Sequence, residues 1–305
     1  MMRKVIRLGT RDSELALWQA NTVKSSLEEL GFRCELISVK ATGDLLLDQP
    51  LYELGITGIF TKTLDVALLK GEIDIAVHSM KDVPTSLPKG IIQAAVLKRG
   101  NPHDLLVHKG LDFLNADGIV ATGSLRRKAQ WLHRYPLHEI TDLRGNVNTR
   151  LEKFRTHSWD AAIFAAAGLE RISLLPEQYS TLEWMIPAPA QGALMVVTTE
   201  DNDYCKEALA PLNDSETEIC TTVEREFLKT LEGGCTAPIG ALAVIEGENL
   251  NFKGILLSLD GQQKYEVKKE ADIRNTKNTG KYFAEEIQKM GGIQLMSEIK
   301  AQLGK

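Results

Sequence analysis

Apolar residues in the first 100 positions alternate between short continuous runs and stretches with helical spacing. The run VIRLGT at residues 5–10 predicts a buried strand, and the stretch after it predicts a helix capped by Ser13. The apolar face of that helix comprises Ala16, Ala20, Val23, Leu27 and Leu30. The pattern continues with a strand at 34–40, a helix at 61–71 and a strand at 74–79. This βαβ order favours a parallel sheet with helices on both faces.

The same alternation begins again after Asn101-Pro102, which indicates a second α/β domain. The expected strands lie at 104–108, 118–123 and 160–166, and the expected helices at 124–135 and 146–154. Residues 186–200, IPAPAQGALMVVTTE, combine proline and glycine with a following apolar run. Such a segment is typical of a chain that crosses between domains and then enters a strand.

The last 90 residues have a different order of elements. A helix from Glu216 places Ile219, Val223, Phe227 and Leu231 on one face. Strands near 241–245, 252–259 and 264–269 follow, and then helices that carry Phe283, Ile287 and Met290. We therefore expect a smaller α+β domain at the C-terminal end. The predicted domains are residues 1–98 with 194–215, residues 99–193, and residues 216–305.

Composition restricts the class of protein. The chain has 305 residues, of which 43% are hydrophobic and 25% are charged, which is ordinary for a globular protein with several cores. The first residues, MMRKVIRLGT, contain no apolar stretch typical of export, and four cysteines without paired spacing disfavour a disulfide framework or a zinc site. We expect a cytoplasmic monomer without bound metal or membrane contact. A net charge of −5 disfavours a nucleic-acid partner.

Polar residues gather directly after predicted strands or in the first turns of predicted helices. In open α/β sheets these positions border the ligand crevice, and helix N-termini and arginines both favour anions. The ligand predicted by this pattern carries several carboxylates or phosphates, held in a cleft that two such domains line. Taken singly, each arginine is better explained as a solvated helix charge, but the adjacent Arg126 and Arg127 cannot both lie on the most exposed line of a helix. The set comprises Arg11, Ser13, Lys81, Asp82, Ser124, Arg126, Arg127, Arg144 and Arg150.

Three residues, one of them from this set, have both a structural and a functional interpretation. Asp82 follows a strand, where aspartate commonly closes a turn or caps a helix, but an ionised carboxylate in a cleft also stabilises a developing cation. We interpret His78 as a hydrogen-bonded histidine at a strand end rather than a catalyst. Cys235 lies in LEGGCTAPIG, where two glycines and a proline present a thiol for covalent attachment, although cysteine is also a common buried residue.

Seven segments, in this order, resemble the porphobilinogen deaminase family, also called hydroxymethylbilane synthases. They are RLGTRDSELALWQA, GEIDIAVHSMKDVP, GSLRRKAQW, LRGNVNTRL, AAAGLERI, PAPAQGAL and LEGGCTAPIGA, and they extend from residue 5 to about residue 245. The resemblance implies two α/β domains similar to the type II periplasmic binding-protein fold, followed by the smaller α+β domain. It also implies a transferase of haem biosynthesis, which joins four porphobilinogen molecules with loss of ammonia into 1-hydroxymethylbilane.

The resemblance also implies roles for individual residues. Cys235 matches the residue that carries a dipyrromethane cofactor through a thioether, and Asp82 matches the catalytic aspartate. The implied cofactor-binding residues are Lys81, Asp82, Thr122, Ser124, Arg126, Arg127 and Arg150. The implied substrate-binding residues are Arg11, Ser13, Phe60, Arg144, Arg150 and Arg171.

Four positions depart from the family pattern and affect loop contacts and local packing. Thr57 replaces a common lysine, Thr63 a common glutamate, Ala190 a usual glycine, and Val197 a usual acidic residue. None of them is one of the predicted site residues.

Two other functions are compatible with parts of the sequence. A two-domain polycarboxylate-binding protein without catalysis would explain the arginines but leaves Cys235 without a role. A nucleic-acid-binding module would use the arginine pairs on phosphates, but it calls for a basic surface and is disfavoured by the net charge.

Overall fold

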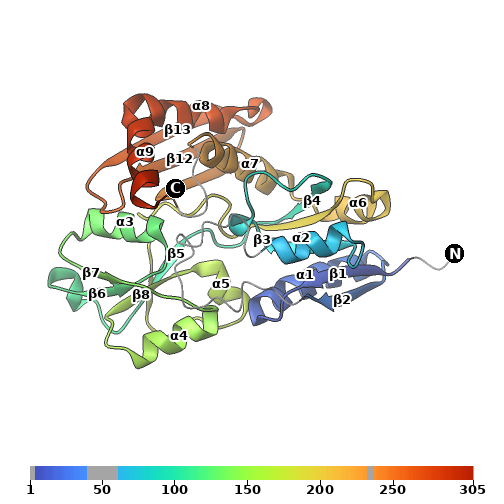
Figure 1. Cartoon of the computed structure of the whole chain (residues 1–305), viewed down its shortest axis with the longest axis horizontal. Coiled ribbons are helices and arrows are strands. Elements are labelled where there is room, and N and C mark those ends of the chain that lie inside the picture. Colours follow the sequence, from blue (N-terminus) through green and yellow to red (C-terminus); the bar gives the residue numbers. More distant parts are fainter. Residues whose placement is uncertain (1–3, 40–60, 232–236, 305) are drawn as a thin grey trace. The chain divides into compact units, whose positions relative to one another are not determined.

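The computed structural model describes residues 4–39, 61–231 and 237–304 (Figure 1). These residues form two compact units. Unit 1 comprises residues 4–39, 61–100 and 192–218, and unit 2 comprises residues 101–191, 219–231 and 237–304. The further division of unit 2 into a second and a third domain stays a prediction, as do the exact domain bounds.

Unit 1 is built on a five-stranded sheet in the order β2-β1-β3-β10-β4. Its strands are β1 (Ile6–Thr10), β2 (Cys34–Ser38), β3 (Ile75–Ser79), β4 (Ile91–Leu97) and β10 (Leu194–Thr199). Its helices are α1 (Glu14–Glu29), α2 (Lys62–Leu69) and α6 (Asp203–Leu209), with the 3-10 turns η2 (Met80–Asp82) and η4 (Ala210–Leu212).

The expectation of a parallel sheet is only partly right for unit 1. Strand β1 pairs in parallel with β2 and β3, but β10 pairs antiparallel with both β3 and β4. The reason is the crossing segment, which returns the chain to the edge of the sheet where β3 ends. Leu194 at the start of β10 therefore lies opposite Ser79 at the end of β3.

Unit 2 contains a second five-stranded sheet, in the order β7-β6-β8-β5-β9. Its strands are β5 (Asp104–His108), β6 (Ile119–Ala121), β7 (Glu139–Thr141), β8 (Ala161–Ala165) and β9 (Tyr179–Thr181). Its helices are α3 (Leu125–Arg134), α4 (Val147–Thr156) and α5 (Ala166–Arg171), with the 3-10 turn η3 (Asp112–Asn115).

The two sheets have the same topology. Strand β6 pairs in parallel with β7 and β8, and β5 is antiparallel to β8 and β9, just as β10 is in unit 1. In each sheet, the antiparallel inner strand directly follows a crossing segment. The crossing segment is residues 98–103 before β5 and residues 186–193 before β10. The predicted α/β class is confirmed, since two mixed sheets with helices are followed by an α+β part.

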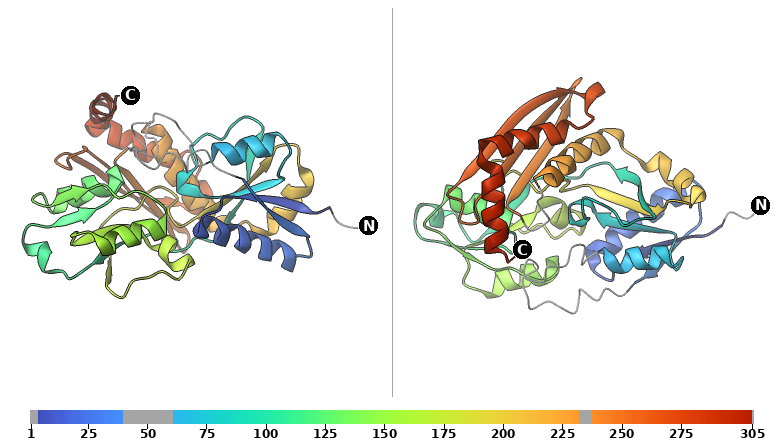
Figure 2. Two further views of the ribbon diagram at one scale, coloured as in Figure 1. Left: turned by 60° about the horizontal axis from the view of Figure 1, so that its bottom comes forward. Right: turned by 45° about the horizontal axis from the view of Figure 1, so that its top comes forward.

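The C-terminal part of unit 2 is an antiparallel sheet covered by helices. Strands β11 (Ile239–Glu246), β12 (Asn249–Leu257) and β13 (Lys264–Asp272) pair in sequence order. Helix α7 (Ser215–Thr230), which begins in unit 1, shares a core with this sheet and with α8 (Thr279–Ile287) and α9 (Ile293–Gln302). The right-hand view of Figure 2 shows α8 and α9 over the strands. The 3-10 turn η5 (Ile273–Asn275) and the π-helical turn η6 (Gln288–Gly292) complete this part.

Burial follows the predicted apolar faces with two exceptions. Val223 and Phe227 of α7 are fully buried, as their spacing predicts. Leu30 is 42% exposed because α1 ends at Glu29, and Met290 is 50% exposed in the turn between α8 and α9. No helix in the described residues is long and apolar enough to cross a membrane.

Two of the four departures from the family pattern have a clear structural setting. Val197 is buried within β10, where an apolar side chain avoids a buried charge. Ala190 has φ 62°, the left-handed region that glycine adopts most readily. Its N–H donates to the buried carboxylate of Glu224 at 2.6 Å, and the other oxygen of Glu224 accepts from Ala243 at 2.7 Å. Glu224 thus joins the crossing segment to β11. Thr57 lies outside the described residues, and nothing in the structure explains Thr63.

We predict that Ala190→Gly leaves the free energy of unfolding nearly unchanged. Relief of the left-handed backbone regains about 1–2 kcal/mol, whereas loss of a buried methyl group costs about 0.8 kcal/mol and a freer unfolded chain about 0.4–1 kcal/mol. The matched control is Ala20→Gly, which is equally buried but lies inside α1. It should lose roughly 2 kcal/mol in urea denaturation. Equal losses for the two variants would contradict the prediction.

Candidate functional site

Four of the predicted site residues follow the parallel strands of unit 1. Arg11 comes directly after β1, and Lys81 and Asp82 lie in η2 directly after β3. Ser13 caps α1 and accepts a hydrogen bond from the N–H of Ala16 at 3.4 Å. Because β1 and β3 run in parallel, their carboxyl ends share one edge of the sheet, and these residues border that edge.

Asp82 has no structural role in the described part of the chain. It ends η2 rather than capping a helix, and its side chain is exposed. No described residue donates a hydrogen bond or forms an ion pair with its carboxylate. The interpretation of Asp82 as a helix cap is therefore wrong, although its place in a turn is as expected. Its carboxylate is available to a ligand in solution.

His78 lies on β3, four residues before Asp82, and its side chain is buried. The expectation that its ring is fully hydrogen-bonded is wrong, because Nε2 has no partner among the described residues. Burial, with a smaller contribution from the positive charge of Arg11, lowers the pKa of His78 to about 4. The ring is therefore neutral at pH 7.

In unit 2 the corresponding edge collects the residues after β6 and β7. Thr122 and Ser124 follow β6, and the Thr122 hydroxyl accepts the Ser124 N–H at 3.3 Å. A methyl group at Gly123 would lie 2.7 Å from the carbonyl oxygen of Leu143 and 3.3 Å from the Arg144 guanidinium carbon. Only glycine permits this close approach, which brings Arg144 beside the start of α3.

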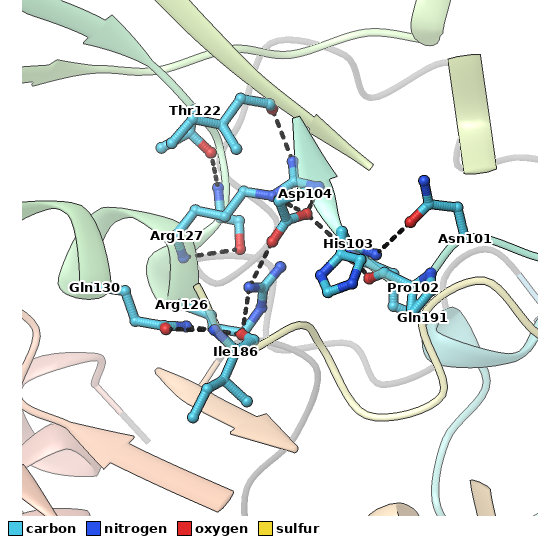
Figure 3. Close-up of polar contacts among 12 residues, drawn as sticks. Asn101, Pro102, His103, Asp104, Thr122, Arg126, Arg127, Gln130, Ile186 and Gln191 are labelled. Atoms are coloured by element: carbon cyan, nitrogen blue, oxygen red, sulfur yellow. Dashed lines mark hydrogen bonds and ion pairs between the residues drawn. The ribbon is translucent and has the colours of Figure 1, made fainter. Parts of the chain in front are cut away.

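Arg126 and Arg127 in the first turn of α3 are both buried, with 4% and 6% of their surface exposed. Figure 3 shows their guanidinium groups directed at Asp104, the first residue of β5, which is fully buried. Arg126 Nη1 donates to Asp104 Oδ2 at 2.8 Å, and Arg127 Nη2 donates to Oδ1 at 2.8 Å. The two arginines are therefore not solvated helix charges.

The cluster of Asp104, Arg126 and Arg127 carries one more positive than negative charge, since a single carboxylate faces two guanidinium groups. Burial alone would raise the pKa of Asp104, but the charges of both arginines hold it well below its usual range. Nε of Arg126 is buried and has no partner among the described residues. A buried surplus charge is costly unless an anion balances it. The N-terminus of α3, capped by Ser124, adds further positive potential.

Asp104 of this cluster and Gln191, which contacts it, were not indicated by the sequence pattern. Asp104 was visible only as a charged first position in an otherwise apolar strand. Gln191, in the crossing segment, donates from Nε2 to Asp104 Oδ1 at 2.9 Å and to the carbonyl oxygen of Pro102 at 2.8 Å. Gln191 belongs to a segment that was expected to cross between domains, whereas Asp104 begins a predicted strand.

The remaining predicted residues are placed less distinctively. Arg150 in α4 donates from Nε to the carbonyl oxygen of Gly145 at 2.7 Å. Arg171 ends α5, and burial lowers the pKa of its guanidinium. Arg144 pairs with the exposed Asp142 at 2.8 Å. Cys235 and Phe60 lie outside the described residues, so their predicted roles have no structural test.

The other cysteines and acidic groups do not form a competing site in the described residues. Cys34, Cys205 and Cys220 are buried, and burial raises the pKa of Cys34 to about 12 and that of Cys205 to about 11. Within the described ranges, no group of three or more His, Cys, Asp or Glu residues is placed to hold a metal ion.

Two family models match consecutive parts of the chain. The model described as the porphobilinogen deaminase dipyromethane cofactor binding domain matches residues 6–207. The model described as the porphobilinogen deaminase C-terminal domain matches residues 218–289.

Relatives of similar length carry the same name. Porphobilinogen deaminase of Geotalea uraniireducens is 39% identical, over 98% of this chain and 96% of the relative. That of Chlorobium phaeobacteroides is 39% identical, over 98% of this chain and 99% of the relative. That of Chloroherpeton thalassium is 42% identical, over 86% of each chain.

Two solved structures show a distant likeness. A periplasmic substrate-binding protein of an ABC transporter from Coxiella burnetii is 14% identical, with a TM-score of 0.42, over 68% of this chain and 91% of that one. The VFT2 domain of BvgS from Bordetella pertussis is 14% identical, with a TM-score of 0.40, over 68% of this chain and 85% of that one. The α/β class follows from the strand order of the two sheets.

We predict that His78 makes the protein less stable as the pH falls from about 6.5 to 4. The unfolded chain, with a histidine pKa of about 6.5, binds a proton in this range that the folded protein does not bind. The free energy of unfolding should fall by roughly 3 kcal/mol from this residue alone. Urea denaturation of His78→Gln should show a correspondingly flatter pH dependence. His157→Gln, at an exposed histidine, is the control, and identical slopes for both variants and the parent would refute the prediction.

Proposed function

The chain belongs to the porphobilinogen deaminase family, and we propose that it is the enzyme that joins four porphobilinogen molecules head to tail into 1-hydroxymethylbilane. The reaction is a step of tetrapyrrole biosynthesis. It releases one ammonia with each addition, and water then cleaves the finished tetrapyrrole from the primer and supplies its hydroxyl group. The alternative, a polycarboxylate-binding protein without catalysis, is not favoured. Relatives that match nearly the full chain are named as deaminases rather than as binding proteins.

The observation that carries the proposal is the surplus positive charge at the start of α3. Each porphobilinogen unit carries an acetate and a propionate, so every ring added brings two negative charges. A carboxylate bound by the free N–H groups of Arg126 and Arg127 would balance the cluster with Asp104. The donor set therefore fits a pyrrole ligand with carboxylate side chains.

The cofactor is dipyrromethane, which supplies a fixed primer whose terminal ring accepts the first substrate. We propose that Cys235 holds it through a thioether. The residues that would bind its rings and carboxylates are Lys81, Asp82, Thr122, Ser124, Arg126, Arg127 and Arg150. Of these, Ser124 and the two arginines lie together at the start of α3.

Asp82 is the residue we assign to the chemistry. In each addition the bond from the substrate's methylene carbon to its amino group breaks, ammonia leaves, a carbon–carbon bond forms and a ring proton is lost. Positive charge develops on the substrate's pyrrole between these events. The exposed carboxylate of Asp82 stabilises that charge, accepts hydrogen bonds from pyrrole N–H groups and takes up the ring proton.

The carboxylates of incoming substrate would be held by a second group of residues, Arg11, Ser13, Phe60, Arg144, Arg150 and Arg171. Arg144 is suited to exchange because its partner Asp142 is 52% exposed, although Arg144 itself is only 15% exposed, so solvent weakens the pair from the side of the aspartate. We propose that the enzyme works as a cytoplasmic monomer and binds no nucleic acid.

Intact mass of the purified chain tests the proposal. The parent should carry the mass of two linked pyrroles, Cys235→Ala should lack it and be inactive, and Cys205→Ala should keep both adduct and activity. Cys205 is a suitable control because it is a buried thiol in α6 with no proposed role. A Cys235→Ala variant with normal turnover would remove the covalent primer from the proposed function.

We predict that Asp82→Asn binds substrate but loses turnover by roughly 10² or more, because both the negative charge and the proton acceptor disappear. Asp82→Glu keeps the charge one methylene away and should retain measurable activity. Single-turnover release of ammonia, followed with intact mass, distinguishes the two. Asp112→Asn, at another exposed aspartate in a 3-10 turn, should behave like the parent. If Asp82→Asn elongates at the parental rate, the catalytic carboxylate is a different one.

A further inference from the structure

We propose that Asp104 is a positioning residue for the reaction: its carboxylate sets the orientation in which Arg126 and Arg127 receive the carboxylates of the primer. This inference rests on the proposed function. Asp104 itself is fully buried and is not placed to contact the ligand. It acts only through the two guanidinium groups.

The two oxygens of Asp104 serve different arginines. Oδ2 accepts from Arg126 Nη1 at 2.8 Å, whereas Oδ1 accepts from Arg127 Nε at 3.1 Å and Nη2 at 2.8 Å. Because a carboxylate is rigid and planar, this division fixes the angle between the two guanidinium planes. Gln191 donates to Oδ1 as well and holds the carboxylate itself in place.

Each guanidinium has a second anchor on the backbone. Arg126 Nη1 also donates to the carbonyl oxygen of Ile186 at 2.8 Å, and Arg127 Nη1 donates to that of Ile163 at 2.9 Å (Figure 3). Gln130 binds both the carbonyl oxygen and the N–H of Ile186, which fixes that anchor in turn. An arginine has five N–H donors, and those on Nε and Nη2 of Arg126 have no acceptor among the described residues. Asp104 thus decides which donors are occupied and which remain.

The charges of the three groups also indicate that Asp104 holds the two guanidinium groups in place. Without Asp104, two buried guanidinium groups would repel each other with no counter-charge in the described residues. With it, they stay together and one positive charge remains for the ligand. The pair of Asp74 and Arg7 in unit 1 differs, because Arg7 and its neighbour Lys4 are accessible to solvent. That pair has no buried surplus charge and serves as a structural comparison.

The experiment compares Asp104→Glu and Asp104→Asn with Asp74→Asn in the full chain. Intact mass gives the fraction of each protein that carries the two-pyrrole adduct, and urea denaturation gives its stability. Asp104→Glu keeps the charge but moves the carboxylate by one methylene, so it should fold and yet load at least fivefold less primer. Asp74→Asn should lose stability but load fully. In the loaded fraction of Asp104→Glu, kcat should fall more than KM rises, because misaligned arginines misplace the growing chain.

Loading of Asp104→Glu equal to that of Asp74→Asn would overturn the inference and leave Asp104 as a structural ion pair. If Asp104→Asn does not fold, Asp104→Glu alone decides the question. Failure of the proposed function would appear differently, as a parent chain that carries no adduct. That result would contradict both the proposed function and the positioning role. If the parent and the Asp104 variants all carry the adduct, only the positioning role is contradicted.

Discussion

The buried carboxylate of Asp104 connects the five-stranded sheet of unit 2 with the crossing segments and with helix α3. Asp104 begins the strand that follows one crossing segment, and Gln191 on the other crossing segment donates to it. Its two arginines begin α3, and α3 in turn packs through Ala129 against Ile255 and Leu257 of β12. The five-stranded sheet, the crossing segments and the C-terminal sheet therefore meet at this helix. A buried ion pair adds little net stability, so its value here is that it fixes one arrangement.

The surplus positive charge of this cluster does not stabilise the folded protein, so we attribute it to function. A cluster optimised for the folded state alone would contain as many carboxylates as guanidinium groups, or none of either. The structure instead keeps an Arg126 Nε without a described partner at the positive end of a helix. Function at this point depends on an interaction that the protein leaves incomplete.

The local elements could be predicted from the sequence because they depend on neighbouring residues. Ser13 caps α1 as expected, and the predicted apolar runs form strands. The direction of β10 and β5 could not be predicted, because it depends on where the chain re-enters a sheet after a long excursion. The adjacent Arg126 and Arg127 were expected not to be surface charges alone, and both are buried, but their partner Asp104 lies 22 residues before Arg126. For Asp82 the sequence motif is more informative than the structure, which shows only an exposed side chain at the end of η2.

The shared strand order of the two sheets has a consequence for how the chain matures. The sheet of unit 2 uses residues 104–181 without interruption, so all its strands are available once that segment has been made. The sheet of unit 1 needs β10, which begins at Leu194, between β3 and β4. During synthesis, β4 therefore has no partner within the sheet until the whole of the inserted segment has been made. Such long-range pairing is slow, because loop closure must precede the contacts that reward it. The sheet of unit 1, which carries Asp82, is thus completed after the sheet of unit 2, although it contains the beginning of the chain.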